Sequence, residues 1–180
     1  YASKLIPLIA EAGLGAIANP LVNITLQWRH DTYPKRRGLL RVKELRQAGI
    51  AVAFGHDCVM DPWYGLGSHD MLEVASMGLH VAQMTGQNEM RACFQSVTTD
   101  AARILGLTHY EIRPGSEASL VVLQAADEAE AIRLRSERLY VIRRGAVIAS
   151  AAPRKSRVMF DGNMFDVDFT RADLEQKIGK

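Results

Sequence analysis

The sequence is poor in cysteine and contains no long hydrophobic run. Its two cysteines, Cys58 and Cys93, exclude a disulfide framework and a C-x-x-C metal site. No run of 18 apolar residues occurs, and the N-terminus lacks the charged and apolar regions of a signal peptide. This usage of cysteine is typical of a reducing compartment, so we expect a cytoplasmic protein.

An excess of one sign of charge is also absent. The 22 lysines and arginines nearly balance the 20 aspartates and glutamates. We therefore expect neither nucleic acid nor a membrane as a partner. The basic stretch PKRRG at 34–38 is interpreted as a solvated loop. The sequence has no P-loop, dinucleotide-binding glycine pattern or Ser/His/Asp triad order, which argues against NTPases, dehydrogenases and serine hydrolases.

The first part of the chain predicts alternating helices and strands. The run IAVAF at 50–54 has no polar alternation, which is typical of a parallel strand covered on both faces. Long loops are expected after each strand, as in βα units. The expected helices cover 3–12, 38–49, 69–86 and 88–107, the expected strands 14–20 and 50–54, and the expected loops 23–37 and 55–68. Ser3 and Asn88 are the expected N-caps of the first and last helices, and Gly13 and Gly49 are expected to end the first two helices.

The pattern changes after Pro114-Gly115. Short antiparallel strands are predicted over 118–125, 139–150 and 157–160, with a hairpin turn at Arg144-Gly145. The segment from 161 onwards shows no clear pattern and is expected to pack over the rest or to fray. A complete (β/α)8 barrel needs roughly 250 residues. The fold prediction is therefore α/β, with the C-terminal part of such a TIM barrel over 1–111, the strands of a small β module over 112–150 and a tail over 151–180.

Asp57 is the best candidate for chemistry because it follows a predicted buried strand. Barrel enzymes collect catalytic groups at the carboxyl ends of their strands. A carboxylate there can bind a divalent metal or accept a proton from water. The alternative is a helix or turn cap, and local spacing does not decide between the two.

Other polar and aromatic residues surround this candidate. Trp63 and Tyr64 could face a flat ligand such as a nucleobase or could wedge the loop onto its neighbour. His56 is interpreted as a structural partner, and Cys58 could line the site but is a poor nucleophile candidate. The first long loop offers four further candidates, which could supply specificity contacts or pin the loop: Gln27, Arg29, His30 and Asp31. Three more histidines are interpreted as structural: His69 as a cap of the following helix, His80 as a satisfied core histidine, and His109 in a connector.

Four stretches together resemble one family. NPLVNITLQWRHDTYPKRRG, VAFGHDCVMDPWYGLG, MGLHVAQM and PGSEASLVVL closely resemble the C-terminal part of bacterial cytosine deaminases of the amidohydrolase superfamily, in unbroken order from Tyr1 to about Ser150. The H-x-E and P-C-x-x-C signatures of zinc cytidine deaminases are absent. The resemblance implies a metal-dependent barrel with a side β-sandwich built from both ends of the chain.

The resemblance also implies roles for residues. In this family one iron or zinc ion activates the water that attacks cytosine, and ammonia leaves. Asp57 matches the aspartate that binds the metal and moves the proton, Trp63 would border the pyrimidine pocket, and His56 would support Asp57. Cys58 stands where one branch of the family has a second aspartate at the edge of the pyrimidine, so the ring that is accepted stays open. Ser119 stands where many relatives carry aspartate or asparagine.

The other metal ligands that the resemblance implies are not in this sequence. One carboxylate is too few, since a catalytic metal site has about three protein ligands. Because the first residue is Tyr1, we expect a piece of a longer protein, inactive alone and completed by its N-terminal part, in an enzyme that is a homo-oligomer. The alternatives are an amidohydrolase acting on another amino-substituted ring, such as a triazine or isocytosine, for which Cys58 and Trp28 leave room, and a non-catalytic remnant.

Overall fold

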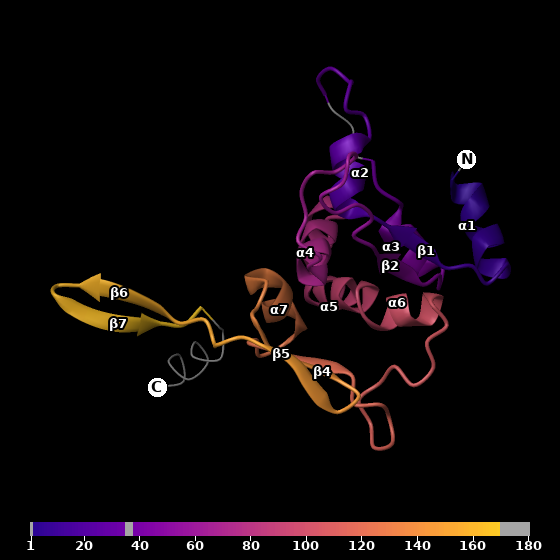
Figure 1. The fold of residues 1–180 in the computed structure, drawn as a ribbon. Coiled ribbons are helices and arrows are strands. Elements are labelled where there is room, and N and C mark those ends of the chain that lie inside the picture. Colours follow the sequence, from indigo (N-terminus) through magenta and orange to yellow (C-terminus); the bar gives the residue numbers. More distant parts are fainter. Residues whose placement is uncertain (1, 35–37, 170–180) are drawn as a thin grey trace. The chain divides into compact units, whose positions relative to one another are not determined.

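The computed structural model describes residues 2–34 and 38–169 and divides the chain into two compact units. The boundary falls between Glu111 and Ile112. Unit 1, up to Glu111, is mainly helical with a short parallel sheet, and unit 2, from Ile112, is mainly antiparallel β (Figure 1). The change from alternating helices and strands to short antiparallel strands, which the sequence predicts after Pro114-Gly115, lies close to this boundary.

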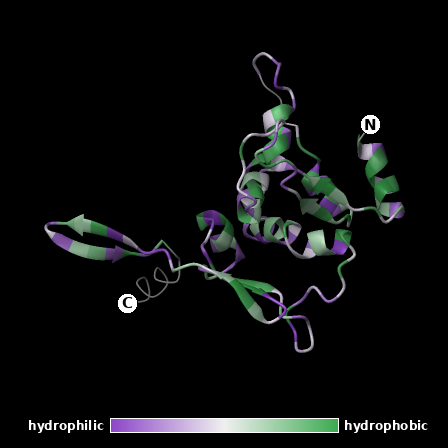
Figure 2. Ribbon diagram, viewed as in Figure 1, coloured by the Kyte–Doolittle hydropathy of each residue, from purple (hydrophilic) through white to green (hydrophobic). Residues whose placement is uncertain are grey.

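Unit 1 follows the predicted alternation of helices and strands. Its elements are α1 (Ala2–Glu11), β1 (Ala16–Ala18), α2 (Pro20–Leu26), α3 (Val42–Gln47), β2 (Val52–Phe54), α4 (Met71–Val81), α5 (Gln87–Ser96) and α6 (Thr99–Ile104). Leucines of α1 remain exposed, among them Leu8 at 58%. Hydrophobic residues make up much of this helix near the N-terminus (Figure 2). An exposed apolar helix face of this kind is normally covered by another element of a complete domain.

The two strands of unit 1 form the predicted parallel pair. Ala18 of β1 lies opposite Phe54 of β2. All three residues of β2 are buried, because α4, α5 and α6 all contact this strand. The ladder reaches one residue beyond β2, where the Gly55 N–H donates to the Ala18 carbonyl at 2.8 Å. The chain segments that follow β1 and β2 therefore leave the sheet at the same edge, and the side chains of their first residues face a common region.

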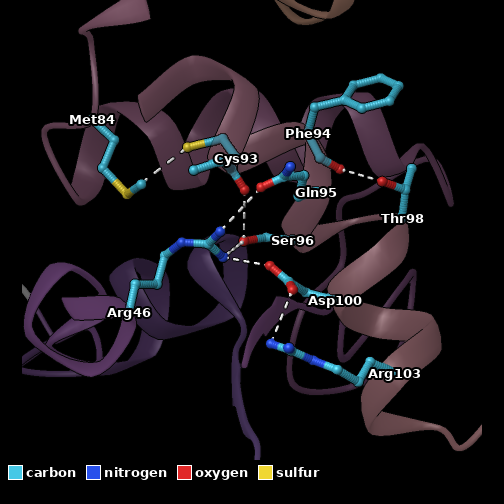
Figure 3. Close-up of polar contacts among 10 residues, drawn as sticks. Arg46, Met84, Cys93, Phe94, Gln95, Ser96, Thr98, Asp100 and Arg103 are labelled. Carbon is cyan, nitrogen blue, oxygen red and sulfur yellow. Dashed lines mark hydrogen bonds and ion pairs between the residues drawn. The ribbon is translucent and has the colours of Figure 1, made fainter. Parts of the chain in front are cut away.

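A polar cluster joins α3 to α5 and α6 (Figure 3). The Arg46 guanidinium donates to the Asp100 carboxylate at 2.5 Å, to Ser96 Oγ at 3.3 Å and to Gln95 Oε1 at 3.2 Å. Asp100 also pairs with Arg103 at 3.3 Å. Because these partners are largely shielded from water, the cluster fixes the helices that support β2.

Several predicted helix ends differ from those observed. Gly13 and Gly49 end their helices as expected, each with a positive φ, of 65° and 78°. The prediction of Ser3 as an N-cap is wrong, since it lies inside α1. Asn88 is likewise inside α5, whose N-cap is Gly86 with Glu89 bonded back to its N–H.

The predicted loop over 23–37 is partly wrong as well. Residues 23–26 continue the helix α2, which starts at Pro20 directly after β1. Pro20 occupies the first turn, where its missing N–H costs no hydrogen bond. The PKRRG stretch begins at Pro34, and its residues 35–37 lie outside the described residues.

Unit 2 contains the antiparallel strands that the sequence predicts and two elements that it does not. Strands β3 (Leu120–Leu123), β4 (Arg138–Arg143) and β5 (Ala146–Ser150) form one sheet in the order β3-β4-β5, with Arg144-Gly145 at the hairpin turn. Helix α7 (Glu128–Leu134) lies between β3 and β4 in the chain. Strands β6 (Ser156–Phe160) and β7 (Asn163–Val167) form a second hairpin, so the start of the expected unpatterned tail is a strand.

The longest helix of the described segments, α4, has 11 residues, fewer than the roughly 20 that span a lipid bilayer. Within residues 2–34 and 38–169, no helix is both long and apolar enough to cross a membrane.

Candidate functional site

The carboxyl ends of β1 and β2 bring together Asn19 and Asp57, which are 38 residues apart in the sequence. Asn19 directly follows β1, and Asp57 is the third residue after β2. The Asn19 Nδ2 atom donates to Asp57 Oδ2 at 3.1 Å. This edge of a parallel sheet is where α/β proteins place their binding sites.

Asp57 is exposed and has a φ of 66°, a conformation that few residues other than glycine, asparagine and aspartate adopt. It does not cap the following helix: the N-cap of α4 is Asp70, whose Oδ1 accepts from the N–H of Leu72 at 2.8 Å. The alternative interpretation of Asp57 as a helix cap is therefore wrong. The prediction that His69 caps this helix is also wrong, because the neighbouring residue Asp70 is the N-cap.

Cys58 lies beside Asp57 and donates its thiol to Asp57 Oδ1 at 3.5 Å. The carboxylates of Asp61 and then Asp57, together with partial burial, raise the pKa of the Cys58 thiol to about 12. A protonated thiol is a weak hydrogen-bond donor rather than a nucleophile. The structure thus agrees with the prediction that Cys58 is a poor nucleophile.

Asp61 shapes the loop that carries the two aromatic candidates. Its Oδ1 accepts from the N–H groups of Trp63 and Tyr64, both at 2.9 Å. The Cys58 thiol and the Tyr64 N–H lower the pKa of Asp61. Trp63 is 68% exposed whereas Tyr64 is 6% exposed, so Tyr64 is the residue that packs the loop onto its neighbours and Trp63 is the one that faces outward.

His56 is held by contacts within its own loop. Its Nδ1 lies 3.1 Å from the Cys58 carbonyl, and its ring lies 6.2 Å from that of His69. Within the described segments, the buried Nε2 atom finds no hydrogen-bond partner. A Cβ atom on Gly67 would lie 2.4 Å from His56 Cε1, so Gly67 leaves room for the ring.

The candidates of the first predicted loop lie at the end of α2 and after it. Gln27 follows α2, and its side chain fills the space beside Gly38. Arg29, His30 and Asp31 come after it, with the first two exposed. The core prediction for His80 is wrong: it is exposed on α4, and its Nδ1 lies 2.6 Å from the Ser76 carbonyl. His109 lies in the connector after α6, and Ser119 Oγ donates to Glu117 at 2.6 Å.

The described residues at this sheet edge offer a divalent metal ion one ligand, the Asp57 carboxylate. The Asp57 carboxylate is exposed, and each of its oxygens keeps a further lone pair beside the bond from Asn19 or Cys58. Within residues 2–34 and 38–169, no group of three or more His, Cys, Asp or Glu side chains is placed to hold a metal. The donor type therefore suits zinc or iron, and Asp57 would supply one of the about three protein ligands of such a site.

Two residues that sequence reasoning missed contribute to this site. The sequence predicts Asn19 only as part of the strand over 14–20, although an asparagine at the end of a strand is itself a polar group at the site edge. Asp61 precedes Pro62, and an aspartate in this context is a known turn former, so its role in shaping the loop had a signal.

Comparisons with known proteins agree on one family. The model of the amidohydrolase family matches residues 1–163. Pterin deaminase of Rhizobium rhizogenes is 34% identical over 155 residues, which cover 84% of this chain and 35% of that protein. N-isopropylammelide isopropyl amidohydrolase of a Pseudomonas species is 31% identical over 108 residues, or 59% of this chain and 27% of that protein.

A solved structure is similar over most of the chain. The crystal structure of 5-methylcytosine deaminase from Klebsiella pneumoniae, liganded with 5-fluorocytosine, superposes with a TM-score of 0.84 at 38% identity. The match covers 91% of this chain and 39% of that one. The chain thus spans about two fifths of this structure and 35% or less of the two curated relatives.

Proposed function

Because the chain belongs to the amidohydrolase family, we propose that it is the C-terminal part of a metal-dependent enzyme that hydrolytically removes the amino group of cytosine or a closely related aminopyrimidine. The similarity to 5-methylcytosine deaminase over 91% of the chain supports this substrate class. The observation that carries the proposal is the exposed Asp57 carboxylate at the carboxyl end of β2, hydrogen-bonded by Asn19 of the neighbouring strand end.

In this proposal Asp57 holds the metal ion and accepts a proton. A divalent ion, iron or zinc, lowers the pKa of water when bound and so supplies a nucleophile near neutral pH. A carboxylate oxygen of Asp57 would hold the ion and would accept a proton from the attacking water. The remaining ligands belong to the N-terminal part of the enzyme, which this chain needs to be active.

The other candidates surround the substrate in the same proposal. Trp63 is the exposed aromatic of the loop and borders the pyrimidine ring. Cys58 adjoins the edge of the ring as a protonated thiol. His56 supports Asp57 from behind, through the bond between its ring and the Cys58 carbonyl.

The fold of the complete enzyme is part of the proposal. Strands β1 and β2 would be two adjacent strands of a (β/α)8 barrel that residues 1–111 help to form. The strands of 112–150 would belong to a small β-sandwich, and 151–180 to a C-terminal segment that begins with the hairpin of β6 and β7. Exposed residues such as Leu8 of α1 and Ile148 of β5 would be covered in the complete enzyme, which we propose to be a cytoplasmic homo-oligomer.

A second candidate is an amidohydrolase of another amino-substituted ring. Cys58 favours it, since a thiol offers the ring edge a different partner from a carboxylate. The relatives that act on pterin and on N-isopropylammelide are named for such rings.

Ammonia release by the full-length enzyme tests both candidates. The purified protein, loaded with zinc or iron, is assayed with cytosine, 5-methylcytosine, isocytosine, pterin and ammelide-type triazines. We expect turnover of cytosine or 5-methylcytosine above that of the other rings. Turnover of a triazine or pterin alone would favour the second candidate. No turnover of any ring, with none of the other implied metal ligands encoded upstream, would favour a non-catalytic remnant.

A further inference from the structure

The contact between Asn19 and Asp57 depends on how Asn19 itself is held. The Asn19 N–H donates to Asn23 Oδ1 at 3.1 Å, and its carbonyl accepts from the Asn23 N–H at 2.8 Å. Both bonds tie Asn19 to the first turn of α2, where Pro20 fixes φ. The backbone of Asn19 is therefore rigidly placed at the carboxyl end of β1.

The side chain of Asn19 serves Asp57 rather than the helix. Asparagine at an N-cap normally accepts a hydrogen bond from the second or third helical N–H. Among the described residues, Asn19 makes no such capping bond, although it occupies the N-cap position of α2. Its amide instead donates to Asp57 Oδ2 at 3.1 Å.

Gly55 leaves the space that this contact requires. A Cβ atom built on Gly55 would lie 2.4 Å from Asn19 Oδ1 and 3.3 Å from Ile17 Cγ2. The φ of Gly55 is not in the left-handed region, so its backbone conformation does not itself demand glycine. The close approach of the Asn19 amide is thus the reason for glycine at this position.

We propose that Asn19 is a positioning residue that orients the Asp57 carboxylate toward the metal ion, and that Gly55 is required because a larger residue would displace the Asn19 amide. This inference rests on the proposed function, since it assumes that Asp57 binds the metal. Asn19 fixes one carboxylate oxygen by a direct hydrogen bond, and the carboxylate keeps further lone pairs with which it would bind the ion. Without this bond, the carboxylate of an exposed loop residue samples other rotamers.

The test uses the full-length enzyme and zinc as the probe. Apoenzyme is titrated with Zn²⁺ in competition with a chelator, and ammonia release is measured in parallel. We expect Asn19→Ala to weaken zinc binding roughly tenfold to a hundredfold, as loss of a partner of a metal ligand does in other enzymes. The unfolding midpoint of the apoenzyme should stay close to that of wild type, because the substitution removes no capping bond of α2.

Asn163→Ala is the matched control. It also removes an asparagine side-chain amide that donates one hydrogen bond, here to the Asp161 carbonyl at 3.3 Å in the turn of unit 2. We expect zinc affinity within twofold of wild type. A comparable loss of affinity in both variants would overturn the proposal, because the effect would then be nonspecific.

A double variant separates positioning from general damage. Gly55→Ala alone should weaken zinc binding as much as Asn19→Ala. In the Asn19→Ala background it should add less than about twofold, because the new methyl group then meets no amide. Additive losses would overturn the role of Gly55, and if Gly55→Ala alone does not fold, folding of the double variant would support the predicted clash.

The outcomes distinguish this inference from the proposed function. Zinc affinity of Asn19→Ala within twofold of wild type would overturn the positioning role while leaving the function intact. Wild-type enzyme that binds zinc but turns over no ring would contradict the substrate class alone, and the zinc comparison would still decide the role of Asn19. Wild-type enzyme that binds no zinc or iron would overturn both.

Discussion

Trp63 and Tyr64 donate their backbone N–H groups to the same atom, Asp61 Oδ1, at 2.9 Å, yet their side chains are exposed to opposite extents. Trp63 is 68% exposed and Tyr64 is 6% exposed. The same turn thus buries one aromatic side chain in the protein and presents the other to the region beyond β2. The two adjacent residues thus differ in their surroundings, and we propose separate roles for them, packing for Tyr64 and contact with a ligand for Trp63.

This division predicts different results for two alanine substitutions in the full-length enzyme. Tyr64→Ala removes a buried ring and should lower the free energy of unfolding by about 3 kcal/mol. Trp63→Ala should change stability by less than about 0.5 kcal/mol but raise KM for the pyrimidine about tenfold, since it removes an aromatic contact. Chemical denaturation and steady-state kinetics measure the two effects. Equal destabilisation by both variants would contradict the assignment.

The polar cluster around Arg46 predicts a loss of stability without direct loss of chemistry. Arg46→Ala removes the bonds to Asp100, Ser96 and Gln95, and should lower the free energy of unfolding of the full-length enzyme by about 2 kcal/mol. Its pair with Asp100 is shielded, with side chains 22% and 13% exposed. Denaturant titration measures the change.

Arg41→Ala is the control for this substitution. Arg41 pairs with Glu44 at 3.9 Å, and both side chains are at least half exposed. Such a surface pair contributes about 0–0.5 kcal/mol. A loss as large as that of Arg46→Ala would mean that burial does not distinguish the two pairs.

The raised pKa of Cys58 predicts slow alkylation. At pH 8, a thiol with a pKa of about 12 forms about a thousandfold less thiolate than one with an ordinary pKa of 9.0. Iodoacetamide should therefore modify Cys58 of the metal-free enzyme very slowly. Because the hydrogen bond to the Asp61 carboxylate, and to a lesser extent its charge, raise the pKa of Cys58, Asp61→Asn should lower this pKa and accelerate the reaction, while its side-chain oxygen still accepts from Trp63 and Tyr64.

Cys93 provides an internal reference for this measurement. Its side chain is fully buried, and burial raises the pKa of the thiol to about 12. It should be modified only on unfolding, in wild type and in Asp61→Asn alike. Mass spectrometry of the two cysteine peptides resolves the sites, and rapid alkylation of Cys58 in wild type would contradict the predicted pKa.

The sequence predicted the elements whose signals are local. The apolar run at 50–54 is a buried parallel strand, and the Arg144-Gly145 turn joins two antiparallel strands, because both depend on residues close together in the chain. Helix α2 was missed since Asn23, Ile24 and Thr25 are weak helix formers, and its start is stabilised by Pro20. The Asp161-Gly162 turn before β7 and the Asp127 N-cap of α7 carried signals that were not used.

The candidate site was predictable only in part. The position of Asp57 after β2 followed from the apolar run, but its exposure and its freedom from a capping role required the structure. The bond from Asn19 joins residues 38 positions apart, and the space at Gly55 depends on the register of two strands. No local pattern encodes such contacts, whereas a three-dimensional arrangement shows them directly.

The most direct test of the whole account is the turnover of Asp57→Ala in the full-length, metal-loaded enzyme. The account predicts a loss of several orders of magnitude in kcat, because a metal ligand and a proton acceptor disappear together. The unfolding midpoint of the apoenzyme should hardly change, since Asp57 is exposed. Turnover close to that of wild type would contradict the central claim that this carboxylate carries the chemistry.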